Sequence, residues 1–515
     1  MLASLKGQKL WVSALLGAFV CLITFGVSVL PAQDNALDID PFADTFGDDP
    51  VVSVEPDEGA DDESGEGEEA PAQKTPEEVL QEAQQHMEKE EWAEAVQKFS
   101  SILAVSPRYV PGYVLRGRAL GQLGENELAL QSLSQAVIYG SQFPEVFIER
   151  GKIFLEERQY REAADDFEQA VQLMPSSAEL QFLRGKSQAR LAQELGASGG
   201  FTSAGLFDTA MKALDRAIFL DEEYAEAYGE RANVHIGMGD ADAAVDDLER
   251  AAELESDNAQ YVVRLALVYS RRAEAEDAAR EPDEKQLHED YRKAILAFKD
   301  YLSIAEDFGL LEDDADPPED PEDILPEQAL LGLASAQINL ADKTDETGLF
   351  RDAIESCDKA IDLRPQLPTA FYQRGVAQRM LNELSAAVDS FSEALDMSPE
   401  FSEARLRRGI VWYHMGQFDL ALGDFERAAE SRDGRGNFWA GATLARQGNY
   451  VEAAQQYSTT IKQNPLYKPA YNNRGLAYMK LGLYKQAAKD FTTLLRMNPK
   501  NSIARQRRDL ALGQK

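Results

Sequence analysis

The sequence predicts an all-α fold, an α-solenoid of about eleven helix-turn-helix repeats. The first observation is a recurring skeleton, in which an aromatic residue and an Arg-Gly pair are followed at fixed spacing by Ala, Phe and Pro. It is clearest in the segments that begin at Phe147, Phe371 and Tyr471. The second observation is a period of about 34 residues, which is typical of stacked supersecondary units and not of a globule around one catalytic pocket.

Each repeat is predicted to contain two amphipathic helices joined by a turn. With Gly475 placed at position 8 of the frame, apolar residues fall at positions 4, 11, 24 and 27, and small residues at 8 and 20. These spacings put one apolar stripe on each helix. Small residues at 8 and 20 let the two helices approach closely. Proline at position 32 ends the second helix, and neighbouring hairpins must stack to bury their stripes.

This pattern resembles the tetratricopeptide repeat family. The resemblance covers roughly residues 76–500, and it implies a right-handed α-solenoid whose first helices line a concave binding surface. It also implies that positions 2, 5, 9, 12 and 13 of each repeat face the ligand. The residues at position 8 of the eleven repeats are Ala83, Gly117, Gly151, Gly185, Ala232, Leu265, Ala334, Gly375, Gly409, Gly441 and Gly475.

Arginine recurs at position 7, and aspartate stands at position 23 in several of the same repeats. A ladder of ligand-binding cations is one interpretation, but the accompanying aspartates favour ion pairs between the two helices of a repeat. If exposed, each pair contributes at most about 1 kcal/mol. The expected pairs are Arg150 with Asp166, Arg231 with Asp247, Arg408 with Asp424, and Arg474 with Asp490.

Residues 1–32 are expected to be a signal peptide or a membrane anchor. Lys6 and Lys9 precede an apolar run over 10–30. A cleavable signal peptide uses the first part of this run and is cut near Ala32, whereas an anchor uses the whole run, which is long enough to cross a bilayer. Both alternatives leave the positive end in the cytoplasm and export the body to the periplasm or another extracytoplasmic compartment.

Residues 33–75 are expected to be a disordered acidic linker. The stretch 34–73 combines many Asp and Glu with Pro and Gly and has no basic residue, so it cannot bury enough apolar area to offset its ordering entropy. The whole chain has a formal net charge of −38, which argues against a general nucleic-acid binder. Residues 366–515 differ, with 21 Lys and Arg against 14 Asp and Glu.

The repeats are expected to form two blocks. Residues 76–305 contain repeats one to six, residues 328–500 contain repeats seven to eleven, and an acidic loop over 306–327 separates them. Residues 501–515 are predicted to form a polar capping helix, since a solenoid needs a cover for its exposed end.

No catalytic, cofactor-binding or metal site is expected. The four histidines lack metal-ligand spacing on one helix, and His86 and His235 occupy the packing position 11. Cys357 stands at the core position 24 and Cys21 lies in the export segment, so no internal disulfide is expected. The sequence therefore predicts a binding protein and not an enzyme.

Two unlike grooves are expected on the concave surface. Position 9 carries Arg118, Lys152 and Lys186 in repeats two to four, which is either a cationic binding ladder or a row of solvated charges. In repeats eight to eleven position 9 is apolar, and an apolar floor with aromatic and basic neighbours suits a protein or peptide segment of acidic character. The alternative interpretation of these residues is an ordinary amphipathic helix surface without a binding role. The residues expected to bind there are Tyr372, Arg379, Tyr413, Arg446, Asn472 and Lys480.

The predicted function is an exported scaffold that mediates protein–protein interaction through these grooves, without catalysis. Two alternatives stay open. In one, the chain is a non-catalytic subunit of an envelope enzyme or a polymer-export assembly. In the other, it is a binding module whose acidic segment 34–73 docks on the grooves and competes with partners. Contact with a membrane is expected through the N-terminal segment alone.

Overall fold

The computed structural model describes residues 76–197, 203–279, 281–312, 323–429 and 434–513. All regular secondary structure in these ranges is α-helical, as the repeat pattern predicts. The expected export segment 1–32 and acidic linker 33–75 lie outside the described residues. Among the helices of the described ranges, none is both long enough and apolar enough to cross a membrane.

The chain divides into two compact units, an N-terminal unit of Met1–Glu222 and a C-terminal unit of Glu223–Lys515. The helices of the N-terminal unit are α2 (Pro76–Glu88), α3 (Trp92–Val105), α4 (Val110–Gln122), α5 (Asn126–Gly140), α6 (Pro144–Glu156), α7 (Tyr160–Leu173), α8 (Ala178–Ala197) and α9 (Ser203–Leu220). Those of the C-terminal unit are α10 (Ala225–Met238), α11 (Ala241–Leu254), α12 (Ala259–Asp277), α13 (Glu284–Asp307), α14 (Pro326–Lys343), α15 (Gly348–Leu363), α16 (Pro368–Met380), α17 (Leu384–Met397), α18 (Ser402–His414), α19 (Phe418–Ala428), α20 (Arg435–Arg446), α21 (Tyr450–Gln463), α22 (Lys468–Lys480), α23 (Tyr484–Met497) and α24 (Ser502–Gly513).

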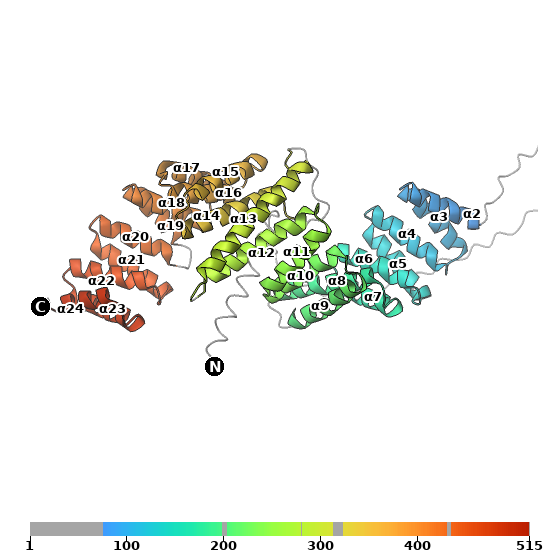
Figure 1. The fold of residues 1–515 in the computed structure, drawn as a ribbon, viewed down its shortest axis with the longest axis horizontal. Coiled ribbons are helices and arrows are strands. Elements are labelled where there is room, and N and C mark those ends of the chain that lie inside the picture. Colours follow the sequence, from blue (N-terminus) through green and yellow to red (C-terminus); the bar gives the residue numbers. More distant parts are fainter. Residues whose placement is uncertain (1–75, 198–202, 280, 313–322, 430–433, 514–515) are drawn as a thin grey trace, which may run out of the picture. The chain divides into compact units, whose positions relative to one another are not determined.

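Successive helices pair into hairpins, one for each predicted repeat (Figure 1). The even-numbered helix comes first and the following odd-numbered helix packs against it, as α5 does against α4. Eleven such hairpins, from α2–α3 to α22–α23, occupy the described ranges, which confirms the predicted repeat fold. The last helix, α24, packs on α23 through Ala504 and Ala511 and lies within the range 501–515 expected to form the cap. Its outer side is less polar than expected, since Ile503 and Leu510 are exposed.

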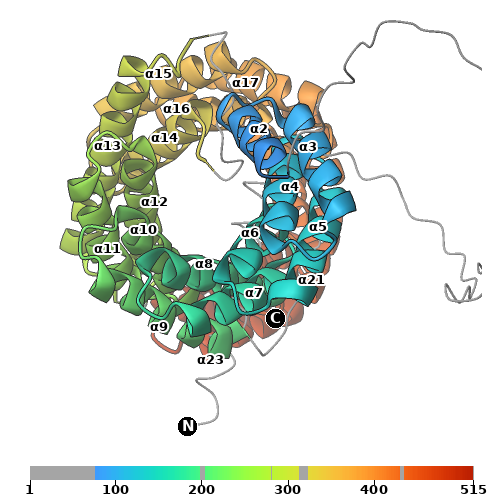
Figure 2. The same cartoon turned by 90° about the vertical axis from the view of Figure 1, so that its right-hand side faces the viewer.

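Within each unit the hairpins form a curved layer. Figure 2 shows α4, α6 and α8 of the N-terminal unit on the inner side of the curve and their partners α5, α7 and α9 on the outer side. In the C-terminal unit α10, α12, α14 and α16 lie on the inner side, and α11, α13, α15 and α17 on the outer side. First helices of neighbouring repeats also contact each other, as α14 and α16 do. The first helices therefore line the concave surface of each unit.

Small residues at position 8 let each hairpin close around a large side chain at position 24. A Cβ atom added to Gly475 would lie 2.8 Å from Cε1 of Phe491, and one added to Gly375 would lie 2.8 Å from Cε1 of Phe391. Both phenylalanine side chains are fully buried. Because core side chains are packed to crystal-like density, these two positions of the frame form a matched pair, and their spacing in the sequence follows from that contact.

The four predicted ion pairs form in the structure. Each arginine donates from Nε and Nη2 to the two carboxylate oxygens of its aspartate, with N–O distances of 2.6 to 2.9 Å. The aspartate side chains are only 5 to 7% exposed, so the small contribution expected for exposed pairs does not apply. The aspartates are buried because position 23 lies beside the core position 24, inside the closed hairpin.

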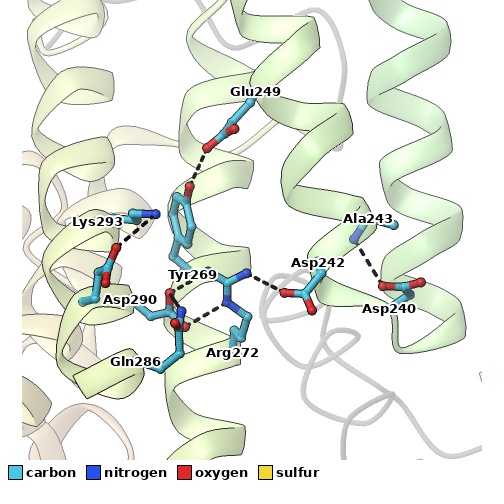
Figure 3. A network of polar contacts seen from close by, with 10 residues as sticks. Asp240, Asp242, Ala243, Glu249, Tyr269, Arg272, Gln286, Asp290 and Lys293 are labelled. Atoms are coloured by element: carbon cyan, nitrogen blue, oxygen red, sulfur yellow. Dashed lines mark hydrogen bonds and ion pairs between the residues drawn. The ribbon is translucent and has the colours of Figure 1, made fainter. Parts of the chain in front are cut away.

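Repeat six has long helices and a displaced ion pair. Helices α12 and α13 have 19 and 24 residues. Arg272, about two turns beyond position 7, donates to the fully buried carboxylate of Asp290 and to Asp242 of the preceding repeat (Figure 3). The hydroxyl of Tyr269 donates to Glu249 of α11 at 2.7 Å. These contacts close the extended end of the hairpin and tie α12 to α11.

The boundary between the two compact units lies between Glu222 and Glu223, whereas the sequence pattern predicts a boundary at 306–327. The reason is that α13, before the acidic segment, packs directly against α14, after it. The ring of Phe298 in α13 fills the space that a Cβ atom on Gly332 of α14 would need. One hydrophobic core, which includes buried residues between Ala225 and Leu340, thus contains residues from both sides of the segment.

Candidate functional site

The cations predicted at position 9 of the N-terminal unit have acidic neighbours. Arg118 donates to Glu149 of the next repeat at 2.5 Å, and this hydrogen bond raises the pKa of the Arg118 guanidinium. Lys152 donates to Glu179 of the following repeat at 3.2 Å. Lys186 lies near a phenylalanine ring of its own helix, α8. The structure places all three cations on first helices, but Arg118 and Lys152 each form an ion pair with a glutamate of the next repeat.

The residues predicted for the C-terminal groove all stand on first helices. They are Tyr372 and Arg379 of α16, Tyr413 of α18, Arg446 of α20, and Asn472 and Lys480 of α22. The structure brings Arg446 and Tyr413 together, since Nε of the arginine donates to the tyrosine hydroxyl at 3.1 Å and the guanidinium lies 6.0 Å from the ring centre. This contact links repeats nine and ten across the concave surface.

The last repeat contributes less to the groove than expected. Asn472 accepts a hydrogen bond from Arg507 of α24. The capping helix therefore already contacts this predicted binding residue. Lys480 is exposed at the C-terminal end of α22. The apolar floor is also uneven, because Ile410 is only 9% exposed and belongs to the core, whereas Leu476 is 37% exposed. We therefore restrict the predicted C-terminal groove to the concave surface of repeats eight to ten.

Aromatic rings give this part of the groove a fixed shape. The ring centres of Tyr413 and Trp439 lie 5.6 Å apart in an edge-to-face arrangement. Those of Tyr372 and Phe401 lie 5.0 Å apart. Edge-to-face and tilted pairs at these separations are favourable, and rigid rings lose little entropy when a ligand binds. The two tyrosines are thus held in place before any partner arrives.

Sequence reasoning missed three charged residues of the same surface. Glu403 and Arg407 of α18 and Arg435 of α20 form a cluster in which both arginines donate to the glutamate, at 3.0 and 2.7 Å. The frame contains a signal for two of them, since Glu403 and Arg435 stand at position 2, a ligand-facing position. Arg407 stands at position 6, beside the structural Arg408, and carries no signal of its own.

Outside the groove, a hollow of about 680 Å³ lies between α13, α14 and α15. Leucines such as Leu302 and Leu333 line it together with charged residues such as Lys299 and Asp352. Within the described ranges, no group of three or more His, Cys, Asp or Glu side chains is arranged to hold a metal ion.

Comparisons with known proteins match the same repeat. One tetratricopeptide repeat profile matches residues 148–198, 338–400, 372–437 and 406–468, a second matches 225–258, and a third matches 469–501.

Among known relatives, DnaJ homolog subfamily C member 3 of Homo sapiens is 25% identical to this chain over 214 residues, which are 40% of this chain and 42% of that protein. The Gallus gallus protein of the same name is 23% identical over 300 residues, 57% of this chain and 52% of that protein. The chain thus spans about half the length of the relatives it matches.

Two solved structures align with parts of this chain. YrrB, described as a TPR protein with an unusual peptide-binding site, is 26% identical and covers 34% of this chain and 92% of its own, with a TM-score of 0.29. A tetratricopeptide repeat protein from Parabacteroides merdae is 16% identical and covers 56% of this chain and 99% of its own, with a TM-score of 0.39. From the recurring skeleton, the eleven hairpins and the profile matches together, we conclude that the chain is a tetratricopeptide repeat protein.

Proposed function

We propose that this chain is a scaffold that holds a protein or peptide segment in the groove of repeats eight to ten and performs no chemistry of its own. Tetratricopeptide repeats generally bind protein or peptide partners. The observation that carries the proposal is the contact between Arg446 and Tyr413, which sets a cation beside an aromatic ring on the concave surface. Arginine and tyrosine are the side-chain types that most often dominate the binding energy of an interface.

The groove suits an extended or helical segment of acidic character. Tyr413 and Trp439 supply a rigid aromatic wall. The arginines around them attract negative charge. Since each repeat contributes one first helix, a partner segment that follows the groove contacts several repeats in succession.

Photo-crosslinking tests this groove. A photoreactive phenylalanine derivative replaces Tyr413 on the concave surface, and in a matched control it replaces Leu420, which is 52% exposed on the second helix α19. We expect the same partner to be captured repeatedly from the position of Tyr413 and not from that of Leu420. Equal capture from both positions would contradict a groove-specific scaffold.

We further propose that the scaffold works outside the cytoplasm. The support is the charge and hydropathy pattern of Lys6, Lys9 and the apolar run 10–30. N-terminal sequencing of the protein recovered from soluble and membrane fractions separates the two forms of export. A new N-terminus near Ala32 identifies a signal peptide, and an intact apolar run in the membrane fraction identifies an anchor. An intact chain found in the cytoplasm would contradict both.

A second candidate function is self-regulation by the acidic segment 34–73. The charge asymmetry favours it, because this segment has no basic residue while residues 366–515 carry a net positive charge. If the segment competes with partners, its deletion should tighten partner binding and change the dependence of affinity on salt. Unchanged affinity and an unchanged salt slope would exclude this function.

A further inference from the structure

A second hollow, of about 410 Å³, lies between α21 and the turn that joins α22 to α23. We call it the α21 hollow, and its apolar lining includes Val451, Leu481 and Leu483. Val451 and Leu483 are 52% and 39% exposed, so apolar area is open to solvent there. None of the six residues predicted for the C-terminal groove lines this hollow. It is therefore a surface separate from the groove of repeats eight to ten.

Arg474 joins two sides of the α21 hollow. Its Nη1 donates to Ser458 of α21 at 2.9 Å, and its guanidinium lies 5.8 Å from the ring centre of Tyr478 of α22. Ser458 and Tyr478 both line the hollow. The arginine is itself fixed by the buried carboxylate of Asp490. The hollow is thus formed before any ligand binds, which lowers the entropic cost of docking.

The α21 hollow is basic, whereas the hollow between α13, α14 and α15 is mainly acidic. The α21 hollow is lined by one lysine, Lys462, and by no carboxylate, and Lys485 is exposed two residues beyond its lining residue Leu483. Residues 450–489 contain six Lys and Arg but a single acid, Glu452, and neither of these two lysines forms an ion pair with a described carboxylate. An acidic segment is therefore attracted to the α21 hollow and not to the other one. The other hollow is lined by two lysines and four carboxylates, which are Lys299, Lys359, Glu306, Asp352, Glu355 and Asp362.

The acidic stretch 34–73 has two halves of different composition. In residues 34–54 the large apolar side chains Leu37, Ile39, Phe42 and Phe46 are separated by aspartates, whereas residues 55–73 contain no apolar residue larger than alanine except proline. A solvated spacer gains nothing from large apolar side chains, but a segment that docks uses them as anchors. About thirty residues join this segment to α2, and they can span up to about 100 Å when extended.

We propose that residues 37–46 of this chain dock in the α21 hollow. An aromatic side chain of the segment fills the apolar part of the hollow beside Val451 and Leu483, and the aspartates lie near Lys462 and Lys485. The inference deepens the second candidate function, because it names the part of the acidic stretch that docks and the surface that receives it. That surface is not the groove, so docking there and partner binding in the groove can be measured separately.

Photo-crosslinking within the full-length chain in detergent tests the docking directly. A photoreactive phenylalanine derivative replaces Leu483, and mass spectrometry identifies the peptides to which it becomes joined. In the matched control the derivative replaces Leu363, which lines the acidic hollow between α13, α14 and α15. We expect crosslinks to residues 37–46 from position 483 and none to this segment from position 363.

A fluorescent peptide with the sequence of residues 34–50 serves as the probe for affinity. It is added to the chain from which 34–73 has been deleted, and its anisotropy is measured over a range of salt concentrations. Replacing both phenylalanines of the peptide by serine should weaken binding about tenfold, since their apolar burial is lost. Lys462→Gln in the chain should weaken binding about threefold and flatten the salt dependence. Lys359→Gln, which removes the same charge from the acidic hollow, is the matched control and should change neither.

Circular dichroism and the thermal transition establish that each variant is folded. If the chain with the derivative at position 483 fails to fold, the derivative replaces Val451, which is 52% exposed. Crosslinks to 37–46 that are absent from a folded variant, or equally frequent from position 363, would overturn the docking. Binding of the peptide that survives the loss of both phenylalanines would also overturn it, because charge alone would then account for the affinity. If crosslinking of a partner from the position of Tyr413 still succeeds in either case, the groove stands and the docking of 37–46 alone is wrong.

Discussion

Asp490 is buried against Arg474, whose guanidinium donates to both of its carboxylate oxygens. The same arginine also donates from Nη1 to Ser458 of the preceding repeat at 2.9 Å. Arg408 repeats this arrangement with Ser392 at 3.0 Å. The arginine at position 7 therefore joins the two helices of its own hairpin and links that hairpin to the one before it. This double connection gives the recurring arginine a structural role.

Removing the carboxylate of this pair should destabilise the last repeats. We expect Asp490→Asn to lower the free energy of unfolding by about 3 kcal/mol, since breaking one partner of a buried ion pair leaves an uncompensated charge. Urea unfolding followed by circular dichroism measures the change. Lys489→Gln on the same helix removes an exposed charge and should have little effect. Equal midpoints for the two variants would mean that the pair contributes no more than a surface contact.

Two glycines in neighbouring helices should respond in opposite ways to alanine. A Cβ atom on Gly436 would lie 2.5 Å from the backbone nitrogen of Ala429, which has no rotamer to change, so we expect Gly436→Ala to be destabilising by more than 1 kcal/mol. A Cβ atom on Gly423 meets nothing within 4 Å, so Gly423→Ala should stabilise α19 by up to about 1 kcal/mol. Thermal unfolding of both variants tests the contrast, and stabilisation in both would contradict the close approach at Gly436.

Cys357 should be unreactive in the folded protein. Its thiol is fully buried, and burial, with the nearby charge of Asp358, raises its pKa to about 12. At pH 8 the reactive thiolate is then about one part in ten thousand, and reagents cannot reach it. In a Cys21→Ser background, modification by a thiol reagent should be slow in buffer and fast in urea. Rapid modification without denaturant would show that repeat seven opens readily.

The period of the sequence was sufficient to predict the fold because each position of the frame reports one contact. Gly475 and Phe491 pack against each other, and Arg474 and Asp490 form their pair, at the separations that the frame gives. Repeat six departs from the frame, since its pair forms between Arg272 and Asp290. The lengthened helices shift the contact by about two turns, and a fixed frame cannot anticipate that shift.

The candidate site was less predictable because it depends on contacts between repeats. The frame identified Tyr413 and Arg446, but it could not show that they touch. It also could not show that Arg507 of the cap reaches Asn472. The role of a charged residue at an exposed position is equally hard to predict from the frame. Arg118 forms an ion pair with Glu149 of the next repeat, and this contact is visible only in the three-dimensional structure.

Alkaline pH should destabilise the C-terminal unit through its buried tyrosines. Tyr457 is 1% exposed, and burial raises its pKa to about 12 from the ordinary value of 10. Since the folded state holds the proton more tightly than the unfolded chain, the stabilisation is complete below pH 10 and is lost as pH rises from 10 to 12. Two pKa units correspond to about 2.7 kcal/mol at most. Tyr457→Phe removes the titrating hydroxyl, so the difference in stability between wild type and variant should change in favour of the variant between pH 9 and about pH 12. Urea unfolding at several pH values measures this difference, and a constant difference would mean that the hydroxyl ionises as readily in the folded protein as in the unfolded chain.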